Sequence, residues 1–192
     1  MKTIAWDIDD VLNDFTRTWL ERAWRPAHPS CAANYADLHE NPPCKILGCE
    51  LSDYLASLDA FRQSAEARQM PPSGEVLAWF ERHGARFRHI AVTAVPIAAA
   101  PWSAWWCLRH FGRWIRTIHV TPSFRPGENL PEYDRTKGQS LERWKQVDAM
   151  VDDGPRNLAS AESSGVLAIC FPRPWNEASS DVAAALDRLT TL

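Results

Sequence analysis

IAWDIDDVLND, residues 4–14, is the stretch that decides the fold class of this 192-residue chain. Residues 2–6 have the apolar pattern of a buried strand, and Asp7 and Asp9 follow where that strand would end. An apolar strand that leads straight into two carboxylates is rare unless a metal ion lies beside them. In an open parallel sheet, ligands bind beyond the carboxyl ends of the strands. The residues that follow each predicted strand are therefore the candidate functional residues.

Four further short apolar segments predict strands at residues 89–93, 117–121, 149–152 and 166–171. Helical patterns lie between them, near residues 15–23, 51–61, 73–84, 101–109, 141–147, 155–161 and 180–189. In one of these, Trp102, Trp105 and Trp106 recur at helical spacing, and we expect their rings to pack against the sheet. The alternation of strands and helices predicts an α/β protein with a doubly wound parallel sheet.

One interval breaks this alternation. From about residue 13 to residue 72 the sequence shows helical and loop patterns but no convincing strand. An interval of about 60 residues is longer than a plain crossover between parallel strands requires. We therefore predict that residues 14–72 form a small helical cap inserted after the first strand, and that residues 1–13 and 73–192 form the α/β core.

Composition excludes several classes of protein. Acidic residues outnumber Lys and Arg by 24 to 21, which argues against a partner that is a nucleic-acid polymer. The most apolar stretch, residues 90–102, is broken by Thr93, Pro96 and Pro101 and is too short to cross a membrane. The first ten residues turn acidic too early for a signal peptide, and the five cysteines lack disulfide-scaffold spacing. We therefore expect a cytoplasmic protein with free thiols.

A zinc cluster in the insert is a second possibility for some of these thiols. Cys31, His39, Cys44 and Cys49 lie within one short stretch, and Cys and His are the ligands that zinc prefers. Their spacing matches no common zinc finger or ribbon. Free thiols and a surface imidazole are the favoured interpretation.

Polar residues also follow the other predicted strands. Thr93 follows the second strand, Asp152 and Asp153 follow the fourth, and Lys137 begins the helix that leads into the fourth. Several carboxylates at one sheet edge would repel one another unless a hard cation lay among them, and such an oxygen-only ligand set suits Mg²⁺. A lysine and a hydroxyl are then what a phosphoryl group needs on its other side. The pattern predicts a Mg²⁺ site for phosphoryl chemistry.

Four segments resemble, in order, the motifs of the haloacid dehalogenase-like hydrolase superfamily: IAWDIDDVLND (4–14), IAVTA (90–94), RTKG (135–138) and AMVDDGPRN (149–157). The resemblance spans nearly the whole chain, and the first and fourth segments together are the most specific. It implies a Rossmann-like core of five parallel strands in the order 5-4-1-2-3, with a helical cap after the first strand. Asp10 departs from the pattern, because many members of the superfamily have Gly there.

The resemblance implies a catalytic role for four residues. Asp7 would attack phosphorus to form an aspartyl-phosphate, and Asp9 would protonate the leaving oxygen and later take a proton from water. Thr93 would bind a phosphoryl oxygen, and Lys137 would neutralise the charge that develops on the phosphoryl group. An acid at position 9 is similar to the phosphatase and phosphomutase members rather than to the dehalogenases.

The resemblance also implies a set of metal ligands. Asp7, the backbone carbonyl of Asp9 and Asp152 would bind Mg²⁺. Asp153 would lie at or next to these ligands, where it could orient Lys137. The cofactor implied is therefore Mg²⁺.

The insert, VDDGPRNL (151–158) and FPRPWN (171–176) are similar to segments of the pyrimidine 5'(3')-deoxyribonucleotidases, which hydrolyse nucleoside monophosphates. That similarity implies aromatic cap residues on which a base would stack. The candidates are Phe15, Trp19, Trp24 and Tyr54. Arg17 or Arg62 would recognise a base edge or the ribose, and Ala94 in the second motif is a further candidate substrate contact.

Together these features predict a Mg²⁺-dependent phosphomonoester hydrolase of small phosphorylated metabolites, with a nucleoside monophosphate as the leading substrate. A phosphatase for a sugar phosphate or another small metabolite is the second hypothesis. A non-catalytic ligand-binding or regulatory protein is the third, because a shared fold does not prove catalysis. The intact set of acids, threonine and lysine favours an enzyme. The ten tryptophans leave both a monomer and a homodimer open.

Overall fold

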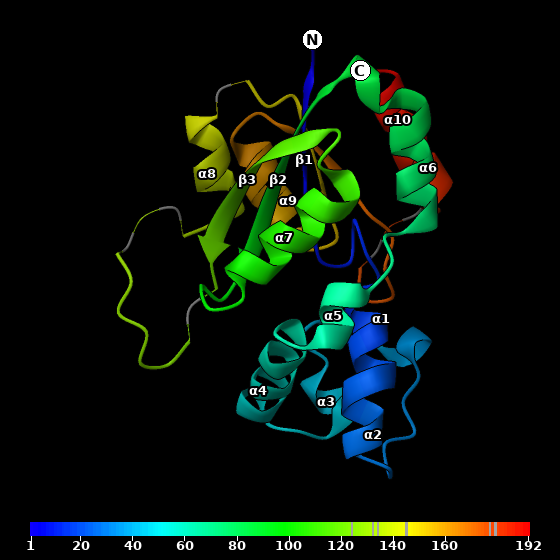
Figure 1. The fold of residues 1–192 in the computed structure, drawn as a ribbon, viewed down its shortest axis with the longest axis vertical. Coiled ribbons are helices and arrows are strands. Elements are labelled where there is room, and N and C mark those ends of the chain that lie inside the picture. Colours follow the sequence, from blue (N-terminus) through cyan, green and yellow to red (C-terminus); the bar gives the residue numbers. More distant parts are fainter. Residues whose placement is uncertain (124, 132, 134, 145, 177, 179) are drawn as a thin grey trace.

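The computed structural model describes residues 1–123, 125–131, 133, 135–144, 146–176, 178 and 180–192. The chain forms a five-stranded sheet in the order β3-β2-β1-β4-β5, and all of its neighbouring strands are parallel. Figure 1 shows how this sheet lies among the helices. The strands are β1 (Thr3–Trp6), β2 (Arg88–Val95), β3 (Ile115–Pro122), β4 (Ala149–Asp152) and β5 (Leu167–Cys170). The predicted α/β class and the predicted strand order are confirmed.

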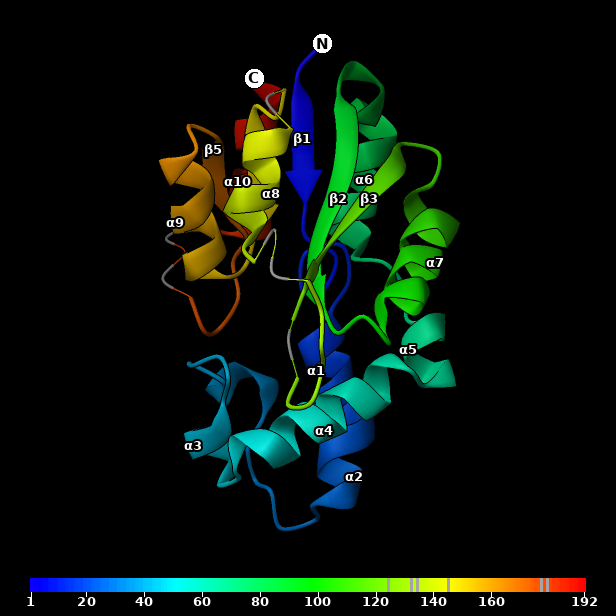
Figure 2. The same cartoon turned by 90° about the vertical axis from the view of Figure 1, so that its left-hand side faces the viewer.

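Helices cover both faces of this sheet (Figure 2). They are α6 (Gly74–His83), α7 (Ala100–Phe111), α8 (Lys137–Arg143), α9 (Pro155–Ser163) and α10 (Val182–Thr190), with a short 3₁₀ turn at Gly84–Arg86. Ile4 and Trp6 pack with apolar residues of α6, α7 and α10, whereas Ala5 packs with residues of α8 and α9. Because successive strand residues point to opposite faces, the central strand β1 contributes to both layers of the core.

The insert forms the lower end of the molecule in Figure 1, while both chain termini lie at the upper end. Its elements are α1 (Phe15–Trp19), a π-helical turn (Leu20–Trp24), α2 (Arg25–Ala27), a 3₁₀ turn (Tyr35–Asp37), α3 (Cys44–Leu47), α4 (Leu51–Arg62) and α5 (Ala65–Gln69). Asn13 and Pro72 pair in a single antiparallel bridge, and the Ser73 N–H donates to the Leu12 carbonyl at 2.8 Å. The chain thus enters and leaves the insert at adjacent points. The division at residues 13 and 73 stays a prediction.

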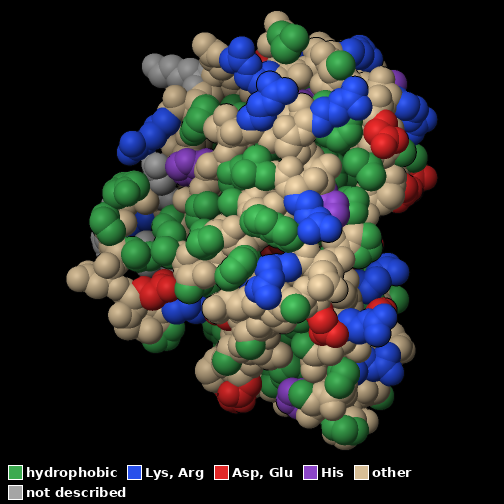
Figure 3. Space-filling model, in the orientation of Figure 1, with side chains coloured by type: hydrophobic (Ala, Val, Ile, Leu, Met, Phe, Trp, Pro, Cys, Tyr) green, Lys and Arg blue, Asp and Glu red, His purple; other side chains and the backbone are tan. Residues whose placement is uncertain are grey.

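Two helix predictions need correction. The helix predicted near residues 141–147 ends at Arg143, so Trp144 and Val147 lie outside it. Trp102 and Trp105 are 41% and 43% exposed, because the buried stripe of α7 runs along another side of the helix. Figure 3 shows hydrophobic side chains on the surface over α7. Among the described residues, none of the helices combines the length and the apolar character that a bilayer crossing requires.

Gly138 allows α8 to lie close against α9. A Cβ at this position would lie 2.6 Å from the carbonyl oxygen of Ser160, and closer still to its hydroxyl. Both atoms belong to a packed helix that cannot retreat without disturbing β4 and β5. The absence of a side chain at residue 138 therefore sets the position of α8, which begins at Lys137.

His89 is a buried histidine that the structure holds neutral. Its Nδ1 accepts a hydrogen bond from the Trp6 indole N–H at 3.0 Å, so the proton is assigned to Nε2, which donates to the Gly84 carbonyl at 2.9 Å. A second proton on the ring would lie on Nδ1, where its N–H would face the N–H of the Trp6 indole. Burial lowers the pKa of His89 to about 4, although the Gly84 hydrogen bond opposes this shift.

We expect Gly138→Ala to lower the free energy of unfolding by about 1–3 kcal/mol, because the added methyl group overpacks the contact between α8 and α9. Urea unfolding measures this change. Gly74→Ala is the matched control, since no other part of the described chain lies within 4 Å of a Cβ there and the residue begins α6. Equal stability of the two variants would contradict the close approach.

The neutral, buried state of His89 predicts how the free energy of unfolding changes with pH. Between pH 6.5 and pH 4 the unfolded chain binds a proton that native His89 does not, so the protein loses stability as the pH falls through this window. The lost free energy is about 3 kcal/mol for this group. His89→Gln removes this titratable group. From pH 6.5 to pH 4, the free energy of unfolding should therefore fall by about 3 kcal/mol less in the variant than in wild type. Parallel curves of unfolding free energy against pH would contradict the assignment.

Candidate active site

The carboxyl ends of the strands open into a cavity of about 270 Å³ that lies against the insert. Side chains of both the sheet and helix α4 line it. The predicted site residues in its wall are Asp7, Asp9, Thr93, Ala94, Lys137, Asp153, Tyr54 and Arg62. Asp152 is fully buried and contacts Lys137. The structure thus brings most of the predicted site to one place.

Lys137 links the ends of two neighbouring strands. Its Nζ lies 2.6 Å from an oxygen of Asp7, after β1, and 2.6 Å from an oxygen of Asp152, at the end of β4. Burial lowers the pKa of Lys137, but Asp152 and Asp7 raise it more, so the ammonium group stays charged. Burial raises the pKa of Asp7 above its usual range, and the charge of Lys137 opposes that shift. Lys137 therefore favours the ionised, nucleophilic form of Asp7.

Asp152 is held from three directions. Its Oδ2 accepts from Lys137, and its Oδ1 accepts from the Gly154 N–H at 2.8 Å and from the Asn157 amide at 2.9 Å. Gly154 and Asn157 lie at the start of α9, next to β4. The carboxylate orientation is therefore set by the turn from strand to helix. Both of these donors belong to the motif at residues 149–157, although the sequence assigned no role to either.

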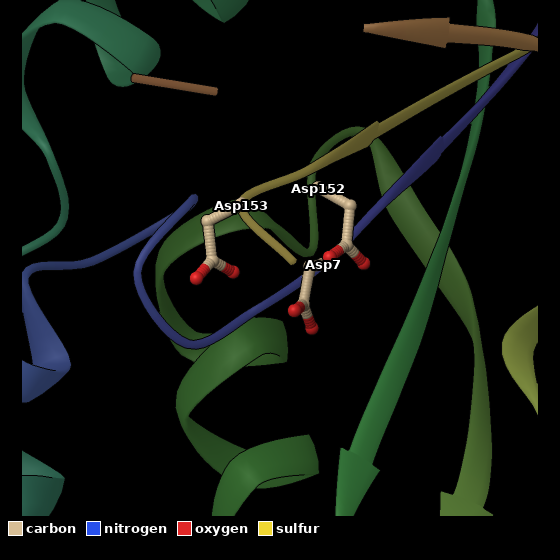
Figure 4. A group of neighbouring side chains, drawn as sticks. All are labelled: Asp7, Asp152 and Asp153. Atoms are coloured by element: carbon tan, nitrogen blue, oxygen red, sulfur yellow. The ribbon is translucent and has the colours of Figure 1, made fainter. Parts of the chain in front are cut away.

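Three carboxylates form a candidate metal centre. Oxygen atoms of Asp7, Asp152 and Asp153 all lie within 4.8 Å of one another. Figure 4 shows that the three side chains leave the ends of β1 and β4 and extend in the same direction. Three carboxylates beside one lysine leave a surplus of negative charge, and their oxygen-only ligands suit a hard divalent cation such as Mg²⁺. The donor set therefore fits the predicted metal.

Elsewhere in the described chain, no further group of three such ligands comes together. In the insert, Cys31, Cys44 and Cys49 are free thiols, and they do not assemble with His39 into a zinc cluster.

Asp9 lines the same cavity as Asp7 and contacts the insert. Its Oδ2 accepts from Nε of Arg62 on α4 at 3.2 Å. Arg62 also contacts Asp59, whose two oxygens accept from Arg125 at 2.6 and 2.9 Å. These linked ion pairs join the core to α4 across the cavity. The predicted metal contact through the backbone carbonyl of Asp9 stays a prediction.

The turn after β1 also explains why this chain can carry Asp10. Asp10 has a φ of 60°, the left-handed conformation that suits Gly and that Asp tolerates. Its carboxylate accepts from the backbone N–H of Thr16 at 2.9 Å and from its hydroxyl at 2.5 Å. Burial raises the pKa of Asp10 to about 6, although Arg173 and Thr16 oppose the shift. The extra carboxylate therefore bonds within the turn and holds the start of α1.

Thr93 and Ala94 lie near the end of β2, and both line the cavity. Thr93 is 1% exposed, whereas Ala94 is exposed. Ser123 and Arg125 follow β3 and line the same cavity. Sequence reasoning missed these two residues, because no motif marks the end of that strand.

Of the four aromatic residues predicted to stack on a base, only Tyr54 lies in the cavity wall. Trp19 and Trp24 are buried in the core of the insert, and Phe15 packs against Phe61 with its ring centroid 5.4 Å away. Tyr54 is the one aromatic residue among the described residues that line the cavity. A small insert needs its largest rings to build its own core, which explains the difference.

Arg17 also lies outside the cavity wall. Its guanidinium stacks over the ring of Tyr35 at 4.4 Å, and both residues line a different surface pocket. Of the two predicted arginine contacts, only Arg62 therefore faces the candidate site.

No known family model and no curated protein matches this sequence. Several solved structures do match its fold. A haloacid dehalogenase-like hydrolase from Streptococcus pneumoniae aligns with a TM-score of 0.65 at 9% identity, over 100% of this chain and 98% of its own. A putative β-phosphoglucomutase from Thermotoga maritima aligns with a TM-score of 0.59 at 16% identity, over 100% of both chains.

A 2-haloacid dehalogenase from Pseudomonas syringae aligns with a TM-score of 0.51 at 16% identity, over 100% of this chain and 99% of its own. These neighbours differ in the activities that their names state, and their identity to this chain is low. What they share with it is the fold, a parallel sheet with flanking helices. The chain therefore has the fold of the haloacid dehalogenase-like hydrolases.

Proposed function

We propose that this protein is a Mg²⁺-dependent phosphomonoester hydrolase that acts through an aspartyl-phosphate on Asp7. One observation carries the proposal. The Asp7 carboxylate is bound to the buried Lys137 beside two further carboxylates, and Asp9 lies two residues away in the same cavity wall. A nucleophile, a cation site and an acid are thus within reach of one small ester.

Asp7 and Asp9 divide the reaction between them. An oxygen of Asp7 attacks phosphorus, and the bond from phosphorus to the alcohol oxygen breaks as that oxygen takes a proton from Asp9. Asp9 then removes a proton from water, which attacks phosphorus and releases inorganic phosphate and free Asp7. The Nε bond from Arg62 holds the Asp9 carboxylate at the cavity wall for both steps.

Lys137 and Thr93 act on the phosphoryl group. The buried ammonium group of Lys137 neutralises the charge that grows on the phosphoryl oxygens, and the low local dielectric strengthens this effect. The hydroxyl of Thr93 supplies a hydrogen bond to a phosphoryl oxygen from near the end of β2, which lies on the other side of β1 from β4. Bound Mg²⁺ would withdraw charge from the same oxygens and orient them for in-line attack.

A nucleoside monophosphate is the first candidate substrate. Tyr54, Leu55 and Leu58 on α4 present an apolar wall, and Ser123 and Arg125 present polar groups from the core. A nucleoside has a flat face and a polar edge that match such a pair of walls. The burial of the insert's tryptophans favours a sugar phosphate as the second candidate, because a sugar needs no aromatic platform.

Asp7→Asn tests the nucleophile, because an amide cannot form the acyl phosphate. We expect Mg²⁺-dependent phosphate release to fall by at least about 1,000-fold. Release is measured from ribo- and deoxyribonucleoside 5'- and 3'-monophosphates, sugar phosphates and an aryl phosphate, with Mg²⁺ and with EDTA. Asp187→Asn, which changes an exposed carboxylate of α10, is the control.

Each outcome of this panel has a meaning. The order of substrates decides between a nucleotidase and another phosphatase. Wild-type rates from Asp7→Asn would overturn the assignment of the nucleophile. No release from any compound by the folded protein would favour a ligand-binding protein on this fold.

Asp9→Asn separates the two steps of the proposed reaction. With an aryl phosphate, whose leaving group needs little protonation, we expect a burst of about one aryl alcohol per protein, followed by slow turnover, because only the hydrolysis step still requires a base. Stopped-flow absorbance records the burst, and acid quenching should recover phosphate bound to the protein. Steady turnover at the wild-type rate without a burst would show that Asp9 is not the acid and base.

A further inference from the structure

The C-terminal segment FPRPWN, residues 171–176, contacts both loops that carry the candidate active site. Its Arg173 binds the loop after β1. Nε donates to the Asp10 carbonyl at 2.6 Å, and the two Nη groups donate to the Asn13 carbonyl at 3.0 Å and to the Asp14 carboxylate at 2.7 Å. One guanidinium group thus spans the turn that follows Asp7 and Asp9.

Two neighbouring residues of this segment bind Asp153, after β4. The indole N–H of Trp175 donates to Oδ2 of Asp153 at 2.7 Å. The amide of Asn176 donates to the Asp153 carbonyl at 2.8 Å and to the Phe171 carbonyl at 2.8 Å. Asp153 is therefore held both at its side chain and at its backbone.

The Trp175 bond matters because of where Asp153 lies. Asp153 is buried, directly after the end of β4. A short N–H bond to one of its oxygens restricts rotation of the carboxylate. The carboxylate is then already ordered at the place where its oxygens lie near those of Asp7 and Asp152.

Trp175 also belongs to the hydrophobic core of the insert. It is 9% exposed, packs with the apolar cluster that contains Phe15 and Trp19, and meets the ring of Tyr35 edge-on with centroids 5.9 Å apart. The Trp175 ring therefore packs in one part of the molecule while its N–H orients a carboxylate of the candidate metal centre in another.

We propose that Trp175 and Asn176 are positioning residues for metal binding: they hold Asp153 in the orientation that lets it join Asp7 and Asp152 around the cation. The inference rests on the Mg²⁺ site of the proposed function and adds residues outside the four motifs. Groups that orient metal ligands commonly change metal affinity by 10–100-fold when they are removed. The same range is expected here.

The test compares two Trp→Phe variants of the full chain. Trp175→Phe keeps a ring but removes the N–H from Asp153. Trp24→Phe is the matched control, since Trp24 is buried in the same cluster and its Nε1 has no hydrogen-bond partner in the described part of the chain. Mg²⁺ alone is titrated by calorimetry, and we expect the Kd to rise by about 10-fold or more for Trp175→Phe. The Kd of Trp24→Phe should stay near that of wild type.

A kinetic measurement distinguishes positioning from a loss of fold. In Trp175→Phe, the Mg²⁺ concentration for half-maximal phosphatase activity should rise by the same factor, while activity at saturating Mg²⁺ and the KM for the phosphomonoester recover. Asn176→Ala, which frees the Asp153 backbone, should also weaken Mg²⁺ binding, and it serves as the test if Trp175→Phe does not fold.

Failure of the inference and failure of the proposed function give different results. If wild type binds Mg²⁺ and the folded Trp175→Phe or Asn176→Ala binds it equally well, the positioning role is overturned and the proposed function stands. If wild type itself binds no Mg²⁺ in the calorimeter, both are overturned. Equal weakening in Trp24→Phe would assign the effect to packing of the insert and overturn the role of the N–H.

Discussion

The rest of the structure depends on one buried contact, in which the ammonium group of Lys137 lies between the carboxylates of Asp7 and Asp152. Buried charges are costly unless they are paired, and here all three are almost fully removed from water. The contact joins the ends of β1 and β4 to the first residue of α8. Any shift of those three elements would leave a charge unpaired. Two further features stabilise this arrangement: the close approach of α8 to α9 at Gly138, and the hydrogen bonds that Gly154 and Asn157 donate to Asp152.

The insert meets this centre through polar contacts rather than through a shared apolar core. Arg62 and Asp59 on α4 bind Asp9 and Arg125 of the core, so the cavity is closed on one side by ion pairs. Such pairs can re-form with a charged ligand, whereas a packed apolar contact cannot. Trp175 is the exception, because it belongs to the insert's apolar cluster and also binds Asp153.

Much of the candidate site follows from local sequence. Asp7, Asp9, Thr93 and Asp153 each sit at or just beyond a strand end, and parallel strands place such residues at one edge of the sheet. Alternation along β1 likewise predicts which side chains enter which layer. The identity of a residue does not reveal which residues surround it. Trp19 has the chemistry of a stacking residue, yet the insert uses it as core.

By itself, the sequence determined the class of fold and the set of acids at the strand ends, because these depend on short-range patterns and on the geometry of parallel sheets. The order of the strands came from the resemblance of the four motifs to the haloacid dehalogenase-like hydrolases. Only the tertiary structure decided which distant side chains complete the site. Arg125 carries no local signal, and the resemblance of FPRPWN (171–176) to a known segment does not show that Trp175 binds Asp153. Each of the two residues contacts a partner more than 20 residues away. Long-range contacts of this kind depend on how the insert and the C-terminal segment fold back on the sheet, and that is a property of packing rather than of any single stretch of sequence.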